Sequence, residues 1–131
     1  MFVDASAIVA MMTNESDAGA LSARLLAGRR RMTSPMALWE AAGAYGRISG
    51  LVPDAALREV EAYIRPLDIA VIAIEADLAR DAVDAYQRFG KGRHPAALNF
   101  GDCFAYAAAR RLGVPLLYKG DDFSLTDMEP A

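Results

Sequence analysis

The chain has 131 residues and a net charge of −3 at pH 7, and 54% of its residues are hydrophobic while 24% are charged. These values are typical of a single globular domain, residues 1–131, with a core that needs no disulfide. They argue against a membrane protein, because no apolar run approaches the roughly 20 residues of a membrane span. The one cysteine, Cys103, excludes an intrachain disulfide and a cysteine-cluster metal site. Since no signal peptide is recognisable either, we expect a cytoplasmic protein.

The spacing of apolar and turn-forming residues predicts short strands that alternate with helices. In chain order these are a strand at 1–3, a helix at 5–12, a helix at 16–28, a strand at 32–34, a helix beginning at 35, a helix from 53 to 66, a β-rich stretch at 67–74, a helix at 75–89, a helix at 100–112 and a strand at 114–118. This alternation favours an α/β fold, with a parallel sheet covered by helices on both faces.

Residue types at the expected helix ends support two of these helices. Ser34 is a suitable N-cap for the helix beginning at 35, and Pro35 suits its first position. Asn99 and Gly113 are suitable residues to begin and end the helix at 100–112. In the helix at 75–89, the residues expected on the apolar face are Ala76, Ala79, Val83 and Tyr86.

Three carboxylates stand out because each is the only charged side chain in a long apolar stretch. They are Asp4 between Met1 and Asn14, Glu40 between Pro35 and Gly46, and Asp102 between Pro95 and Ala109. An ionised carboxylate among apolar side chains is costly unless it is paired, hydrogen-bonded or bound to a cation. Because the sequence offers no obvious buried Arg or Lys beside them, the simplest shared partner is a hard divalent cation.

The predicted strand ends indicate where these carboxylates meet. Ligands of parallel sheets bind outside the carboxyl ends of the strands. Asp4 follows the first strand, and the pair Asp121 and Asp122 follows the last one, so they are expected at the same edge of the sheet. Asp102 lies in the first turn of the helix that leads to the last strand. Glu40 depends on how its helix packs, because nothing local places it at that edge.

Four segments carry a family likeness. They are Met-Phe-Val-Asp4-Ala-Ser6, Glu40 in an early helix, Asn99-Phe-Gly-Asp102-Cys, and Leu-Leu-Tyr-Lys-Gly120-Asp-Asp122-Phe-Ser-Leu-Thr126-Asp127. In this order they resemble the PIN-domain ribonucleases, and specifically the VapC-type toxins of bacterial toxin-antitoxin modules. The resemblance implies a three-layer α/β/α sandwich with a central parallel sheet and a metal-dependent endoribonuclease activity. It also implies an RNA substrate, a cognate VapB-type antitoxin and a homodimer.

The resemblance assigns roles to individual residues. It implies that Asp4, Glu40, Asp102 and Asp122 are the catalytic and metal-binding residues, with Asp121 open as an alternative to Asp122. The implied cofactor is Mg²⁺, with Mn²⁺ as a second option. A water activated by the metal is the expected nucleophile, and the products carry a 5′-phosphate and a 3′-hydroxyl. The polar residues expected in supporting positions are Ser6, Asn99 and Thr126.

Each carboxylate also has a purely structural interpretation. Asp4 and Asp102 could stabilise the first turns of helices, Glu40 could lie at a helix surface, and Asp121 and Asp122 could be turn residues. The alternative function is therefore a non-catalytic PIN-like module that binds RNA or a protein, although all four acids are present. A phosphoacceptor receiver domain or a haloacid-dehalogenase-like phosphatase fits less well, because each needs a further acid near the first strand.

Aromatic and sulfur-containing side chains near the acids are expected in the core. Trp39, Tyr45 and Phe104 are interpreted as core residues rather than base-stacking platforms, and Cys103 as a small apolar core residue. An antitoxin is expected to cover the early helices near Leu38 and Trp39 with an apolar helix or tail. It could place a basic side chain in the acidic cleft.

Two segments are locally basic, although the net charge of the chain is negative. Residues 29–31 are three consecutive arginines, and residues 90–95 combine Lys91, Arg93 and His94 with glycines and a proline. Each segment is either a solvated loop or a phosphate contact, and the sequence favours neither.

Overall fold

The protein, described by a computed structural model for residues 1–131, forms four strands, six α-helices and one short 3₁₀ helix, η1. In chain order they are β1 (Phe2–Val3), α1 (Ala5–Met12), α2 (Ala18–Ala27), β2 (Arg31–Thr33), α3 (Pro35–Ser49), α4 (Pro53–Ile64), β3 (Ile69–Val71), α5 (Leu78–Phe89), α6 (Phe100–Leu112), β4 (Leu116–Leu117) and η1 (Phe123–Leu125). The predicted elements are confirmed with ends that differ by up to three residues, and η1 is the one element that the sequence does not predict.

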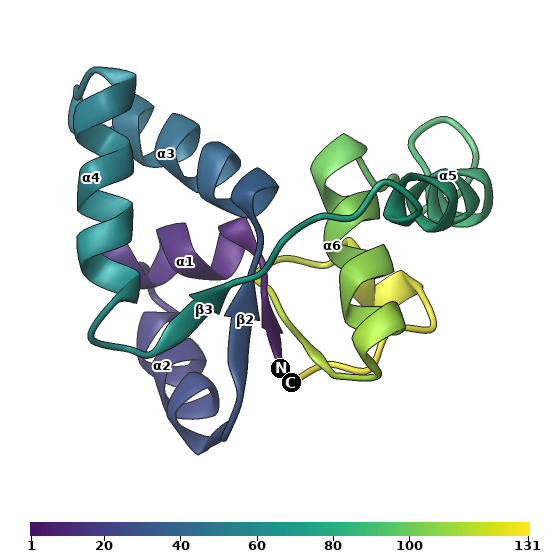
Figure 1. Cartoon of the computed structure of the whole chain (residues 1–131), viewed down its shortest axis with the longest axis horizontal. Coiled ribbons are helices and arrows are strands. Elements are labelled where there is room, and N and C mark those ends of the chain that lie inside the picture. Colours follow the sequence, from purple (N-terminus) through teal and green to yellow (C-terminus); the bar gives the residue numbers. More distant parts are fainter.

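The strands form one parallel sheet in the order β3-β2-β1-β4. Successive residues of a strand point to opposite faces, and the core reflects this alternation. Val3 and Leu117 belong to the cluster formed with α1 to α4, whereas Phe2 and Leu116 belong to the cluster formed with α5 and α6. Figure 1 shows the first four helices on one side of the sheet and α5 and α6 on the other. The predicted α/β/α sandwich is confirmed.

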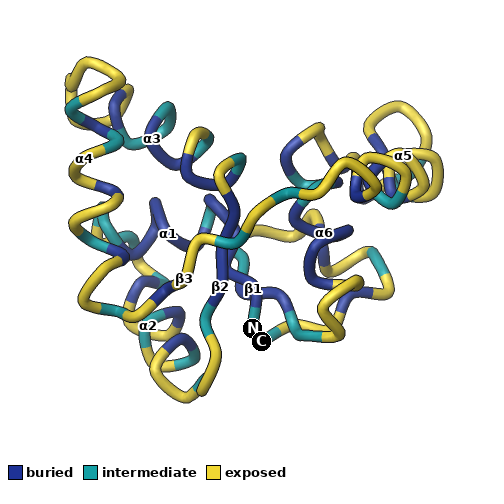
Figure 2. The backbone as a smooth tube through the Cα atoms, viewed as in Figure 1, coloured by how far each residue is buried: buried dark blue, intermediate teal, exposed yellow.

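The parallel arrangement brings several loops to one edge of the sheet. Asp4, Ser34 and Lys119 come soon after the carboxyl ends of β1, β2 and β4. The backbone N–H of Asp4 donates to Leu117 O at 2.9 Å, which joins the ends of β1 and β4. Figure 2 shows that β1 and most of β2 are buried, so this edge is built on the buried centre of the sheet.

Local hydrogen bonds begin the two helices that carry Glu40 and Asp102. Ser34 Oγ accepts from the backbone N–H of Ala37 at 3.2 Å and caps α3. Asn99 Oδ1 accepts from the backbone N–H of Asp102 at 3.0 Å, and Asp102 Oδ2 accepts from that of Asn99 at 2.8 Å. This reciprocal capping box satisfies two N–H groups at the start of α6. Both predicted N-caps are confirmed.

The prediction of which side of α5 is buried is wrong. Leu78, Ala82 and Ala85 are the buried residues of this helix, whereas Val83 is 65% exposed and Tyr86 is also exposed. The helix has apolar residues on two sides, and the side that carries Leu78, Ala82 and Ala85 packs against the alanine-rich α6. The spacing alone therefore selects the wrong side, because close packing between these helices favours small side chains.

Trp39 is also placed differently from the prediction, since its side chain is 78% exposed. Tyr45 and Phe104 pack partly buried against the core and Cys103 is buried, as predicted. Trp39 belongs to neither core cluster, so its side chain stays at the surface of α3. None of the helices combines the length and apolar character that a membrane span requires.

Candidate functional site

Asp4 is the most buried of the four predicted acids, with only 3% of its surface exposed. It caps α1, and its Oδ2 accepts from the backbone N–H of Ser6 at 2.9 Å and from Ser6 Oγ at 2.6 Å. Ser6 Oγ in turn accepts from the backbone N–H of Lys119 at 3.0 Å. The carboxylate is therefore held rigidly between the start of α1 and the end of β4.

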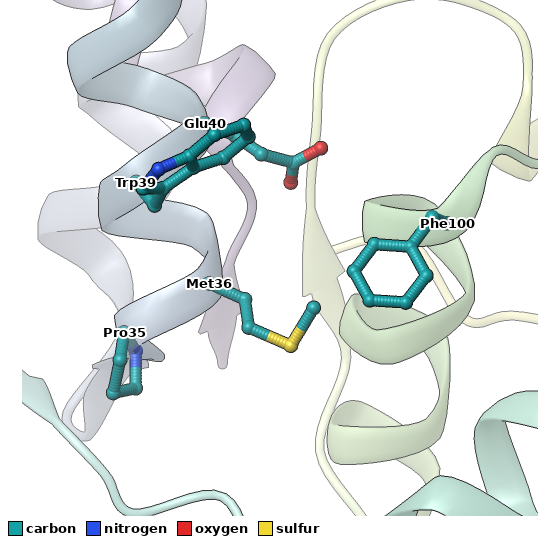
Figure 3. A pocket seen from close by; sticks show the side chains of 5 residues that line it. All are labelled: Pro35, Met36, Trp39, Glu40 and Phe100. Atoms are coloured by element: carbon teal, nitrogen blue, oxygen red, sulfur yellow. The ribbon is translucent and has the colours of Figure 1, made fainter.

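Glu40 reaches the same edge of the sheet through helix packing. It lies in the second turn of α3, and α3 contacts α6. Figure 3 shows its carboxylate extending from α3 toward α6, where Phe100 lies. Glu40 forms no hydrogen bond or ion pair with another side chain, in contrast to Asp4. Its position depends on the packing of α3 against α6, which sequence patterns do not report.

Asp102 is fixed by the capping box at the start of α6 and, together with Asp4 and Glu40, lines one open pocket of about 500 Å³. The fourth acid comes from the turn after β4. The charge of Asp122 acts on both Asp4 and Asp102 and raises their pKa values. Asp121 instead lines a separate pocket beside α2. The structure therefore brings three acids into one pocket, with Asp122 within electrostatic range.

Burial and mutual repulsion perturb the titration of these carboxyls. Burial raises the pKa of Glu40 to about 7, and the charges of Asp4 and Asp102 contribute to this shift. Burial also raises the pKa of Asp102 to about 6, against the opposing effect of the hydrogen bond from Asn99. The pKa of Asp4 is raised by burial, although the hydrogen bonds that it accepts oppose the shift. The site therefore concentrates negative charge in a poorly hydrated region.

Three further charged residues line this pocket and are missing from the sequence prediction: Glu15, Arg47 and Lys119. Arg47 is seven residues after Glu40, a spacing that places both on one face of α3 and could have revealed it. Lys119 forms an ion pair with Glu15, and its Nζ lies 3.9 Å from Asp17 Oδ1. The pocket is thus lined by four carboxylates and by two cationic side chains, Arg47 and Lys119.

The predicted supporting residues divide into two groups. Ser6 and Asn99 line the acidic pocket and hydrogen-bond its carboxylates, as described above. Thr126 does not line the pocket. Its Oγ1 donates to Phe123 O at 2.7 Å and accepts from the backbone N–H of Met128 at 3.1 Å, so it stabilises the turn that follows η1.

The two basic segments lie outside the acidic pocket. The arginine triplet precedes and begins β2, at the opposite end of that strand from the acids. Arg31 donates to the backbone oxygens of Gly28, Leu67 and Leu26, which gives it a structural role. In the second segment Arg93 stacks over the ring of Tyr86.

The donor chemistry of the pocket suits a hard divalent cation, because it consists of carboxylate oxygens without a histidine or thiol. None of the four acids has a Lys or Arg partner among the ion pairs of the structure. No three His, Cys, Asp or Glu side chains are arranged to hold a metal ion together. The types of residue in the pocket nevertheless fit a divalent cation.

Comparison with known proteins finds one family and relatives that match this chain over nearly its whole length. The sequence profile of the PIN domain matches residues 1–128. The chain is 40% identical to a protein named Ribonuclease VapC from Mycolicibacterium smegmatis, over 98% of this chain and 97% of that protein. It is 41% identical to VapC ribonuclease R02377 from Rhizobium meliloti, over 97% of this chain and 98% of that protein.

A solved structure shares the fold. The crystal structure of VapC20 from Mycobacterium tuberculosis, described as a sarcin-ricin loop cleaving toxin, superposes with a TM-score of 0.75. The match covers 99% of this chain and 97% of that chain at 23% sequence identity. At this identity the likeness supports the sandwich architecture alone.

Proposed function

The chain belongs to the PIN-domain family, with VapC ribonucleases as relatives, and from this membership we propose that it is the endoribonuclease toxin of a VapBC-type toxin-antitoxin system. We further propose that its activity depends on Mg²⁺ or Mn²⁺ held by Asp4, Glu40, Asp102 and Asp122. The observation that carries the metal proposal is that Asp4, Glu40 and Asp102 line one pocket, are largely buried there and have no ion-pair partner. A non-catalytic module is not favoured, because the relatives are ribonucleases.

In the proposed mechanism the chain holds the acids and the cation neutralises them. A bound Mg²⁺ or Mn²⁺ would lower the pKa of an attacking water and offset the charge that develops on the scissile phosphate. Asp4 supplies the rigid carboxylate, because Ser6 fixes its orientation. Glu40 and Asp102 approach from different helices and would supply further carboxylate oxygens to the cation. Their raised pKa values mean that metal binding displaces protons near neutral pH.

The cationic side chains of the pocket would bind the RNA backbone. Arg47 and Lys119 lie beside the acids, where a phosphate group on either side of the scissile bond could contact them. Cleavage of RNA in the presence of Mg²⁺ or Mn²⁺, compared with an EDTA control, tests the proposed function directly. The Asp102→Asn variant makes this test specific for the site. An RNA-cleaving toxin would act in the cytoplasm, as the sequence leads us to expect.

The antitoxin is proposed to bind the groove between α3 and α4. This groove has a volume of about 650 Å³ and is lined by Pro35, Leu38, Trp39, Ala42, Gly43, Pro53, Asp54, Leu57 and Glu61. Trp39 lines both this groove and the acidic pocket. An apolar antitoxin helix in the groove could therefore extend a basic side chain to the acids.

Trp39→Ala is expected to weaken binding of the cognate VapB-type antitoxin by about 30-fold, since an exposed tryptophan at the centre of an interface commonly contributes about 2 kcal/mol. Isothermal titration calorimetry with purified antitoxin measures the change. Ile48→Ala is the matched control, because Ile48 is another exposed apolar residue of α3 but does not line the groove. Unchanged affinity in Trp39→Ala would exclude this groove as the main contact.

A homodimer is proposed through the surface between α5 and α6. Its pocket of about 500 Å³ is lined only by apolar and aromatic residues: Ala79, Ala82, Val83, Tyr86, Phe100, Cys103 and Phe104. Val83 and Phe100 are 65% and 70% exposed. Such a surface carries no charge that would oppose a second copy, and pairing would cover its exposed apolar side chains.

Val83→Asp is expected to convert the dimer to a monomer, because the pairing would bury an uncompensated charge. Light scattering after size-exclusion chromatography at about 50 µM measures the mass, a concentration at which a dimer with a micromolar Kd is mostly assembled. Leu26→Asp is the control, since Leu26 is similarly exposed on α2. A monomeric wild-type protein, or a dimeric Val83→Asp variant, would contradict the proposed interface.

A further inference from the structure

Helix α6 contains a glycine that its backbone does not require. Gly101 is the second residue of this otherwise alanine-rich helix, where glycine is less favourable than alanine. The glycines with positive φ are Gly50, Gly92, Gly113 and Gly120. Gly101 is not among them, so its presence needs an explanation other than backbone conformation.

The space beside Gly101 is occupied by the carboxyl group of Glu40. A Cβ atom added at Gly101 would lie 2.0 Å from Glu40 Oε1, 2.1 Å from Oε2 and 2.2 Å from Cδ. These distances are far below any contact that real Cβ atoms make, so an alanine here would force the carboxyl group away. The three nearest atoms all belong to the end of the Glu40 side chain and none to the backbone of α3.

Other helical glycines do not share this environment. A Cβ at Gly19 in α2 would meet nothing within 4 Å, and a Cβ at Gly43 in α3 would meet only Arg47 Nη1, at 3.6 Å. A Cβ at Gly46 would meet Leu51 O at 3.1 Å and Ala56 Cβ at 3.2 Å, a tight approach to the α3–α4 connection and to α4 rather than to an acid of the site. Among these helical glycines, Gly101 is the one whose missing side chain makes room for an acid of the site.

We propose that Gly101 is a positioning residue of the acidic site, which lets the Glu40 carboxyl group lie against the first turn of α6 beside Asp102. Glu40 forms no hydrogen bond or ion pair, so this contact across α3 and α6 determines where its carboxyl group lies. The backbone N–H groups of a helix N-terminus favour a carboxylate at this position. This proposal concerns the metal site of the proposed function. Its expected consequence, a change in metal affinity, rests on that proposed function.

The test uses Gly101→Ala in the full-length protein. We expect Mn²⁺ affinity, measured by titration calorimetry, to fall at least tenfold, because Glu40 loses its position beside Asp102. The melting temperature in EDTA is expected to stay the same or rise, since the flexible Glu40 side chain can swing away and alanine favours the helix. Gly19→Ala is the matched control: the same substitution in open helical space should leave Mn²⁺ affinity unchanged.

A second variant separates positioning from packing. Glu40→Asp shortens the side chain by one methylene, so in combination with Gly101→Ala it makes room for the added methyl group. The double variant is expected to bind Mn²⁺ at least threefold more tightly than Gly101→Ala alone, a non-additive effect typical of residues in contact. A lower melting temperature in EDTA without this recovery would identify Gly101 as a packing residue and overturn the proposal.

A crystal structure of metal-free Gly101→Ala gives a readout that does not depend on metal binding. The Glu40 carboxyl group should move away from α6 relative to the wild-type structure, and an unmoved carboxyl group would overturn the proposal. Wild-type protein that binds no Mn²⁺ would refute the metal-site proposal instead. The two failures are therefore distinguishable.

Discussion

Asp102→Asn should reduce metal-dependent cleavage of RNA at least about 100-fold while the protein stays folded, since loss of one group that stabilises developing charge typically costs this much. Asparagine retains the oxygen that accepts from the backbone N–H of Asn99, so the start of α6 remains capped. It removes one negative charge from the group that would bind Mg²⁺ or Mn²⁺. The variant therefore separates the chemical role of the carboxylate from its structural role.

Cleavage of end-labelled RNA, with either metal and with EDTA, measures this effect. Asp84→Asn is the control, because Asp84 is an exposed acid of α5 that lies outside the acidic pocket. Thermal unfolding of both variants checks that they are folded. Cleavage that persists in EDTA, or an Asp102→Asn variant as active as Asp84→Asn, would refute the carboxylate-metal mechanism.

The metal-free protein should become less stable as the pH rises from 5 to 8. The folded-state pKa values of Glu40 and Asp102 are raised to about 7 and about 6, from ordinary values of 4.5 and 3.8. At a pH between the ordinary pKa and the raised folded-state pKa of each group, the folded chain holds protons that the unfolded chain has lost. Raising the pH therefore favours unfolding. With allowance for solvent screening, we expect a loss of about 2 kcal/mol in the free energy of unfolding.

A divalent cation should oppose this trend, because it binds the same carboxylates once they lose their protons. Mn²⁺ at about 100 times its Kd would add about 2.7 kcal/mol at pH 8. The stabilisation by Mn²⁺ should be smaller at pH 5, where protons compete with the cation for the carboxylates. Urea unfolding in EDTA and in Mn²⁺ measures both quantities, with the double variant Glu40→Gln and Asp102→Asn as the control that flattens the pH dependence. A metal-free wild type that is more stable at pH 8 than at pH 5 would show that burial and mutual repulsion do not raise the pKa values of these acids.

The features that depend on nearby residues can be predicted from the sequence. Asn99 and Asp102 are three positions apart and form the capping box from their own segment, and Ser34 caps α3 in the same way. Asp4 and the Asp121–Asp122 pair follow short apolar strands, and the parallel sheet brings these strand ends to one edge. Element order, the α/β class and the identity of the isolated acids are therefore readable from spacing and residue type.

The way in which distant segments meet is visible in the tertiary structure and not in the sequence. The tertiary structure placed Glu40 against Gly101, set Asp122 rather than Asp121 within electrostatic range of Asp4, and turned Trp39 toward solvent. It also reversed the expected face of α5, because both sides of that helix are apolar and the fit of small residues against α6 selects one of them. These outcomes depend on side-chain volume and helix approach across long sequence separations, whereas caps and strand ends depend on hydrogen bonds within a few residues.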